Sequence, residues 1–204
     1  MATATSSRRL VLALALVGAV ALLVAGCGGA SGGGRTTTAQ SHAAAGPFAW
    51  LRASSPPPGW TIARLPSGKA AMAYPPGWRA IKTDPGTVSA ALMGPHGRIR
   101  GYLNATPRSG AETLANWATF RVAHNREEGD RAVVRESTAS GVHFRSGVGS
   151  CVTDRYATTT GAHYREIACI VRGARGTTVI VAAAPPSDWS RIAPQLQRSV
   201  ASFA

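Results

Sequence analysis

The pattern of apolar and polar positions divides the chain into three regions. An uninterrupted apolar run lies near the N-terminus, and a segment rich in Gly, Ser and Thr without apolar periodicity follows it. From Phe48 onward, short apolar stretches alternate with turn residues, a pattern typical of a domain rich in β-strands. The pattern therefore predicts a leader (residues 1–26), a tether (27–46) and a single folded domain (47–204).

Short β-like segments dominate the predicted domain. Pro75-Pro76-Gly77 and Gly94-Pro95-His96-Gly97 provide two of the turns between them. The predicted strands cover residues 60–65, 70–74, 78–82, 88–93, 98–104, 132–138, 142–157, 162–171 and 177–184.

Two helices complete the prediction. Ser109-Gly110-Ala111-Glu112 matches a capping box, which predicts that the first helix starts there and ends near Glu128-Gly129. After residues 185–188, one apolar stripe predicts a terminal helix, and Pro194 within it predicts a kink or a restart. The stripe consists of Trp189, Ile192, Leu196, Val200 and Phe203. The order of elements indicates an α+β fold, an antiparallel β-sheet packed with two main helices.

The leader has the layout of a secretory signal. Arg8 and Arg9 precede the apolar run, which at about sixteen residues is short for a membrane-spanning helix of roughly 20. Val24-Ala25-Gly26-Cys27 at its end resembles a bacterial lipobox. The resemblance implies a lipid-bearing Cys27 (diacylglyceryl, often with a further acyl chain such as palmitate) at the extracytoplasmic face of the cell membrane. An ordinary signal peptide, or an uncleaved anchor with an accidental cysteine, is the alternative.

Charge and composition narrow the possible partners. Lys and Arg number 22 against 9 Asp and Glu, which gives a formal net charge of +13. A basic protein beside a membrane could bind another envelope protein, anionic lipid or an acidic envelope polymer. The arginines are scattered, however, so compositional drift in a GC-rich genome, such as that of an actinobacterium, is the favoured explanation over a functional basic surface. Export argues against nucleic acid as a partner.

Cys151 and Cys169 form an even pair once Cys27 carries lipid, and an exported protein meets an oxidising compartment. The segments around them read as a hairpin with a three-residue loop that ends in Gly161. In that register the two cysteines face each other as a non-hydrogen-bonded pair, with Cα atoms about 4.5 Å apart. We therefore expect a disulfide between Cys151 and Cys169.

The same register creates two unfavourable pairs. It sets Arg155 opposite Arg165, and it sets a second pair of like charges, Asp154 and Glu166, face to face. A shift by one residue would pair Arg155 with Glu166 but would separate the cysteines. Cross-strand charge pairs contribute only about 0.2–1 kcal/mol, whereas a disulfide closing such a loop contributes about 3 kcal/mol. The balance favours the disulfide.

One motif carries a family resemblance. Tyr74-Pro75-Pro76-Gly77-Trp78 resembles the opening of PsbP-like domains. The capped middle helix, the long hairpin after Gly141 and the terminal helix ending Ala201-Ser202-Phe203 follow at similar distances, so that the resemblance covers roughly residues 60–203. It implies a layered α+β sandwich that binds or stabilises protein partners and is not an enzyme.

No catalytic or metal-binding motif is recognisable in the sequence. The five histidines lack metal-ligand spacing, and no nucleophile elbow is present. His143 and His163 lie in predicted neighbouring strands, where a coincidental pair is the favoured interpretation over a metal site. We expect no catalytic residues, no metal and no cofactor, and the ligand-binding residues are unknown at this point.

These patterns favour a non-enzymatic binding or accessory lipoprotein of the cell envelope. Two other functions stay open. An envelope hydrolase would need a polar cleft in which two or more ionisable groups converge. A carrier of a small ligand or lipid would need a deep apolar cavity between sheet and helix.

The lipobox generates a direct prediction. Replacing Cys27 with Ser removes the sulfur that takes the lipid, so the Cys27→Ser protein is expected to be released from the membrane or to accumulate as unprocessed precursor. Fractionation of cells followed by mass spectrometry of the N-terminus measures both. Normal processing and membrane retention of the variant would contradict lipidation at Cys27.

Overall fold

The computed structural model describes residues 46–204. The predicted leader, Cys27 and the tether up to residue 45 lie outside the described residues. The strands are β1 (Thr61–Arg64), β2 (Ala71–Tyr74), β3 (Arg79–Ile81), β4 (Val88–Met93), β5 (Ile99–Pro107), β6 (Arg131–His143), β7 (Gly147–Ala157), β8 (His163–Gly173) and β9 (Gly176–Ala184). The helices are α1 (Trp117–Glu127), α2 (Trp189–Ala201) and the short η1 (Pro95–Gly97).

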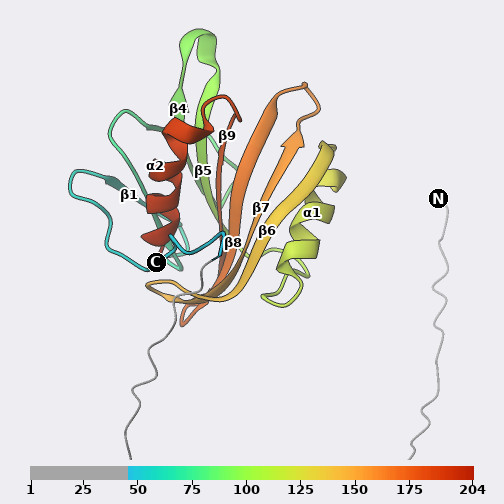
Figure 1. Cartoon of the computed structure of the whole chain (residues 1–204). Helices are drawn as coiled ribbons and strands as arrows, with labels where there is room; N and C mark the ends of the chain where they lie inside the picture. The colour runs from blue at the N-terminus through green and yellow to red at the C-terminus, as the bar shows by residue number, and fades with distance from the viewer. Residues whose placement is uncertain (1–45) are drawn as a thin grey trace, which may run out of the picture. The chain divides into compact units, whose positions relative to one another are not determined.

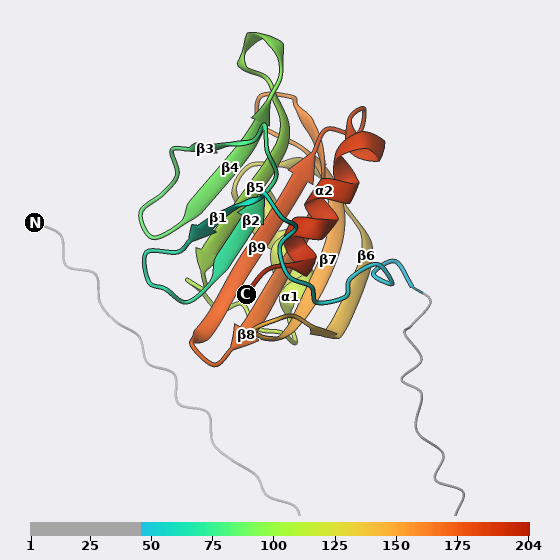
Figure 2. The ribbon, with the colours of Figure 1, turned by 90° about the vertical axis from the view of Figure 1, so that its left-hand side faces the viewer.

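Seven strands form one antiparallel sheet in the order β3-β4-β5-β9-β8-β7-β6, and β1 and β2 pair as a separate hairpin. Figures 1 and 2 show α1 and α2 on opposite faces of the large sheet. The α+β class predicted from the sequence is therefore confirmed. Within residues 46–204, neither helix has both the length and the apolar content needed to cross a membrane.

The main core lies between α2 and the sheet. Ile192, Leu196 and Val200 are almost completely buried, and Phe203 is buried just beyond the helix. They pack against alternate positions of the central strands, since successive side chains of a strand point to opposite faces. The predicted apolar stripe is thus the core face of α2. The helix runs without interruption across Pro194, so the expected restart is wrong.

The β1–β2 hairpin and the PsbP-like motif extend the α2 layer. The Ser199 hydroxyl on α2 donates a hydrogen bond to the carbonyl oxygen of Ala73 at 2.6 Å. Trp78 is buried, and its indole N–H donates to Oε1 of Gln195 on α2 at 2.8 Å. The motif therefore has a structural role, because it ties the hairpin to the terminal helix.

On the opposite face, α1 packs against β6, β7 and β8. Trp117 is buried there, and Leu114, Ala118 and Phe120 pack against the same apolar cluster. The helix does not extend over β5 and β9, and the same face of these two strands borders a groove, described below.

Two boundaries differ from the prediction. The first helix begins at Trp117 and not at Ser109, because Thr113 and Asn116 form the reciprocal cap: each backbone N–H donates to the other's side-chain oxygen. The predicted break at Gly141 is a bulge inside β6, which continues to His143. The chain turns after Phe144, so β7 begins later than expected.

Candidate functional site: a polar groove beside α1

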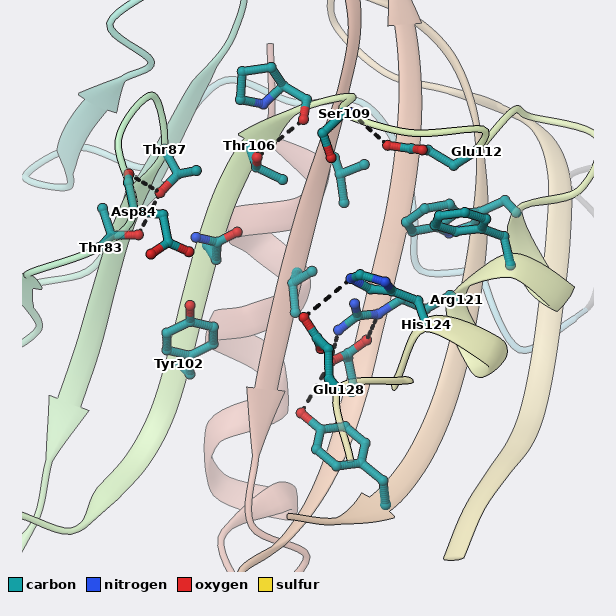
Figure 3. A pocket seen from close by; sticks show the side chains of 18 residues that line it. Thr83, Asp84, Thr87, Tyr102, Thr106, Ser109, Glu112, Arg121, His124 and Glu128 are labelled. Atoms are coloured by element: carbon teal, nitrogen blue, oxygen red, sulfur yellow. Dashed lines mark hydrogen bonds and ion pairs between the residues drawn. The ribbon is translucent and has the colours of Figure 1, made fainter. Parts of the chain in front are cut away.

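A groove of about 400 Å³ lies on the α1 face of the sheet. Its floor consists of β5, β9 and β8, and α1 forms one wall (Figure 3). The loop between β3 and β4 forms the opposite wall, and the segment between β5 and α1 closes one end. The lining side chains are mostly polar and belong to Thr83, Asp84, Thr87, Tyr102, Asn104, Thr106, Pro107, Ser109, Glu112, Trp117, Phe120, Arg121, His124, Glu128, Tyr156, Glu166, Val179 and Val181.

The loop wall is shaped by Asp84-Pro85-Gly86-Thr87. Proline at the second and glycine at the third position, with a φ of +85° at Gly86, match a type II turn. The backbone N–H and the hydroxyl of Thr87 both donate to the carbonyl oxygen of Asp84. The turn therefore places the Asp84 side chain at the rim of the groove (Figure 3).

A chain of side-chain hydrogen bonds fixes this loop to the sheet. The amide of Asn104 on β5 donates to the Ser89 hydroxyl on β4 at 2.8 Å, and that hydroxyl donates to Thr83 at 3.0 Å. Thr83 in turn contacts Thr87. Because each of these side chains is bonded to the next, the loop wall is held in position by hydrogen bonds within the protein, without a ligand.

The helix wall carries a ladder of rings. Trp117, Phe120 and His124 follow one another along α1, with ring centroids 6.2 Å and then 5.7 Å apart. His124 Nε2 lies 3.2 Å from Oε1 of Glu128, just beyond the helix. The wall thus combines stacked rings with a carboxylate at its end.

A buried ion pair joins this wall to the floor. Arg121 donates to both carboxylate oxygens of Glu166 on β8, at 2.7 and 2.9 Å, and the Tyr156 hydroxyl donates to the same carboxylate at 3.3 Å. Burial alone would lower the pKa of Arg121, but the charge and hydrogen bonds of Glu166 hold that pKa above its usual value. Burial raises the pKa of Tyr156, and the Glu166 charge adds to this effect.

A second buried acid lies directly behind the pair. Asp154 on β7 faces Glu166 across the strands and accepts a 3.4 Å hydrogen bond from the amide of Asn125 on α1. Burial first, and then the nearby Glu166 charge, raise the pKa of Asp154 to about 8. Among the described residues, Asp154 Oδ1 and Asn125 Oδ1 have no hydrogen-bond partner.

Glu112 closes one end of the groove. Its side chain is only 4% exposed, and Oε1 accepts a 2.8 Å hydrogen bond from the backbone N–H of Ser109. The other oxygen, Oε2, has no hydrogen-bond partner within residues 46–204. The contact of this carboxylate with the Ser109 backbone is the one that a capping box predicts, but no helix follows it directly, and the carboxylate lies at the groove.

The groove is acidic although the protein is basic. Four of the nine acids line it, together with a single arginine out of 22 basic residues. That arginine is Arg121, which is already paired with Glu166. The remaining carboxylates and hydroxyls can accept hydrogen bonds from a donor-rich or cationic ligand, and the ring faces can contact a cation.

Sequence reasoning did not find this groove. The sequence placed Glu128 only near the end of the first helix and indicated no role for Asp84. The sequence Asp-Pro-Gly-Thr signals the turn, but no local signal places that turn opposite α1. His143 and His163, considered as a pair, lie toward opposite ends of the sheet, because they align with Val148 and Ala157 of β7. No cluster of three or more potential metal ligands occurs in the described part of the chain.

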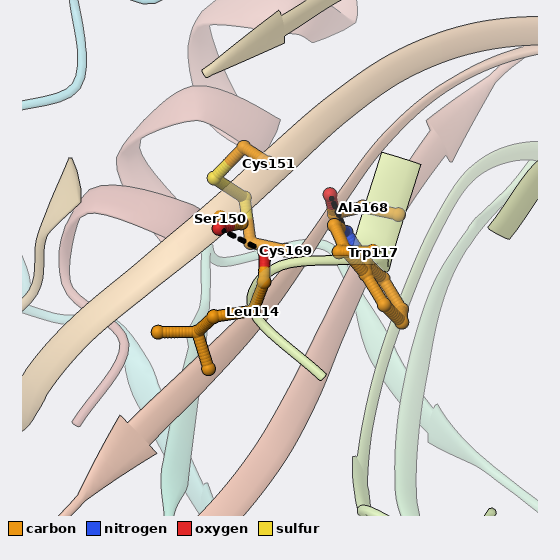
Figure 4. Close-up of a disulfide and its surroundings, with 6 residues drawn as sticks. All are labelled: Leu114, Trp117, Ser150, Cys151, Ala168 and Cys169. Carbon is orange, nitrogen blue, oxygen red and sulfur yellow. Dashed lines mark hydrogen bonds between the residues drawn. A yellow bond between two sulfur atoms is a disulfide. The ribbon is translucent and has the colours of Figure 1, made fainter. Parts of the chain in front are cut away.

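The predicted disulfide is present. Cys151 and Cys169 are bonded, their Cα atoms are 4.1 Å apart, and β7 and β8 pair in the expected register. On the other face of the same strands, α1 is fixed by two hydrogen bonds (Figure 4). The Ser150 hydroxyl donates to the Leu114 carbonyl at 2.7 Å, and the Trp117 indole donates to the Ala168 carbonyl at 2.9 Å.

Comparisons with known proteins identify the fold. No protein-family model matches the sequence, and no curated protein matches it. The solution structure of cyanobacterial PsbP (CyanoP) from Synechocystis sp. PCC 6803 is similar, with a TM-score of 0.52 and 13% identity over 72% of this chain and 92% of that chain. LpqN of Mycobacterium tuberculosis, described as involved in cell envelope biogenesis, matches at a TM-score of 0.38 and 13% identity, over 72% and 85% of the chains. The first similarity shows a PsbP-like fold alone, and the second is too weak to add to it.

The buried acid Asp154 generates a prediction about pH. Because its pKa is raised from 3.8 to about 8, the folded state binds this proton more tightly than the unfolded state between these values. Stability therefore falls as pH rises through that window, by up to about 1.4 kcal/mol per pH unit from this group. Asp154→Asn removes the titration, so its stability relative to wild type is expected to increase from pH 4 to 8 and then to level off.

Urea unfolding at a series of pH values measures this difference. Glu127→Gln, an exposed position on α1, controls for the loss of one negative charge. A stability difference between wild type and Asp154→Asn that does not change with pH would contradict the assignment.

The disulfide generates a prediction about redox dependence. Replacing both Cys151 and Cys169 with Ala is expected to lower the free energy of unfolding by about 3 kcal/mol, because the unfolded chain regains the freedom that the bond removes. Urea unfolding of the full chain, with and without dithiothreitol, tests this. Reductant should destabilise the wild type and leave the double variant unchanged; equal responses would count against the bond.

Proposed function

We propose that this protein is a non-enzymatic binding or accessory module of the bacterial cell envelope, held at the outer face of the cytoplasmic membrane by a lipid on Cys27. Its binding surface is the groove beside α1. The lipobox-like sequence and the signal-like leader support the location. The groove supports the proposed binding role.

The observation that carries this proposal is that the walls of the groove are positioned by bonds within the chain. Hydrogen bonds through Ser89 hold the loop wall, and the Arg121–Glu166 pair holds the helix wall. Ligand sites are typically concave and largely formed before the ligand arrives. A groove with fixed walls and polar groups pointing inward meets this description.

The two rival functions fit the groove less well. A lipid carrier requires an apolar cavity, whereas this groove is lined mainly by polar groups and the space against α2 is filled by core side chains. Ionisable groups do converge in the groove, as an enzyme would require. Glu166, however, is bonded to both Arg121 and Tyr156, so this buried carboxylate is already committed to neighbours within the chain.

Site-specific photo-crosslinking in intact cells tests the proposal. Benzoylphenylalanine replaces Pro107, which lines the groove, in the full-length protein. The matched control carries the same group at Ser190, which is exposed on α2. A discrete crosslinked product from position 107, absent from position 190, is the expected result.

Mass spectrometry of the product identifies the bound molecule. Crosslinks of equal yield and identity from both positions, or none from position 107 in cells that produce the protein, would argue against the groove as the binding surface.

A further inference from the structure

The charges of the groove favour one class of ligand. Once Arg121 and Glu166 have neutralised each other, the carboxylates of Asp84, Glu112 and Glu128 remain. An anion would find no unpaired arginine or lysine among the lining residues. The local charge therefore attracts a cation, in a protein whose overall charge of +13 repels cations elsewhere.

Glu112 gives this preference a specific contact. A buried carboxylate is costly unless its oxygens receive hydrogen bonds. Oε1 receives one from Ser109, whereas Oε2 has no partner in the described part of the chain. A Cβ at Gly110 would lie 2.8 Å from this oxygen and 3.8 Å from Phe120 Cζ. A side chain at Gly110 would therefore collide with this carboxylate, so glycine is the residue that fits beside Glu112.

The three carboxylates are spread around the groove. Asp84 lies on the loop wall, Glu112 at one end and Glu128 beside the helix wall (Figure 3). They are not gathered as metal ligands, since no group of three such side chains occurs within residues 46–204. Val179 and Val181 of β9 provide apolar floor, and Phe120 adds an apolar ring to the helix wall.

We propose that the groove binds an aliphatic polyamine, with one ammonium group at the Glu112 carboxylate and another near Asp84 or Glu128. The methylene spacer lies over the valines and Phe120. Separated positive charges joined by an apolar chain match separated carboxylates around the two valines and Phe120. This inference rests on the proposed binding function and names the ligand class of the same groove.

Isothermal titration calorimetry of the full chain in non-ionic detergent, at low salt, tests the proposal with putrescine as the probe. A dissociation constant below about 1 mM is expected, since even small ligands reach this range when charged contacts are buried. Butylamine, with one ammonium group, should bind about tenfold more weakly, in line with the loss of one charge-assisted hydrogen bond. Butanediol, of the same length and uncharged, should give no measurable heat.

Variants assign the contacts. Glu112→Gln keeps an oxygen for Ser109 but removes the charge, and should weaken putrescine binding about tenfold or more. Glu128→Gln and Glu127→Gln form a matched pair of neighbouring residues, of which only Glu128 lines the groove. The first should weaken binding about threefold, as expected for an exposed charge, and the second should change it less than about twofold. This pair keeps the test valid if Glu112→Gln fails to fold.

Three results would overturn the inference: no heat with putrescine, equal affinity for putrescine and butanediol, or equal effects of the Glu127 and Glu128 variants. A groove-specific crosslink in cells combined with no putrescine binding would leave the binding function in place and remove only the ligand class. Putrescine binding without any crosslink from position 107 would support the ligand class and count against the cellular role.

Discussion

The buried ion pair between Arg121 and Glu166 is the interaction on which the α1 side of the molecule depends. The disulfide register sets Asp154 directly opposite Glu166, and two like charges cannot both be buried there without compensation. The guanidinium neutralises Glu166 through two hydrogen bonds, and Asp154 retains its proton. Breaking a buried pair costs about 3–5 kcal/mol, which approaches the stability of a small domain. The same contact holds α1 in place as the wall of the groove.

On the other face of the β7–β8 hairpin, a second pair of like charges is compensated in a similar way. Arg155 faces Arg165 in the same register. Glu136 on β6 accepts a 2.6 Å hydrogen bond from Arg165, and the Arg165 guanidinium lies 4.8 Å from the ring centroid of Trp189 on α2. Each unfavourable cross-strand pair is therefore compensated by a different element. The register of this hairpin is a property of the whole fold and not of the two strands alone.

The success of sequence reasoning depended on how local each signal was. The strands, the apolar stripe of α2 and the Cys151–Cys169 register follow from spacing along short segments. Two boundaries were predicted wrongly. The capping box at Ser109 does not start the helix, because a second cap at Thr113 lies closer to it, and Gly141 does not separate two strands, because β6 continues through it as a bulge. In neither case does the sequence signal distinguish the observed boundary from the predicted one. The groove was not predictable, since the turn at Asp84, the loop at Glu112 and the end of α1 meet only through long-range packing.

The two faces of the sheet differ in how freely their residues can be substituted. Almost all of the large core lies on the α2 face, whereas the groove occupies the α1 face beside β5 and β9. Groove-lining side chains that neither pack in a core nor fix a wall, such as Asp84 and Glu128, can therefore change without disturbing the fold. Trp117, Val179 and Val181 belong to the smaller core on this face, and Arg121 and Glu166 hold α1 in place, so these residues are constrained. Related chains with this architecture are free to diverge in what they recognise while they keep the same framework, and sequence similarity among them would fade first at the groove.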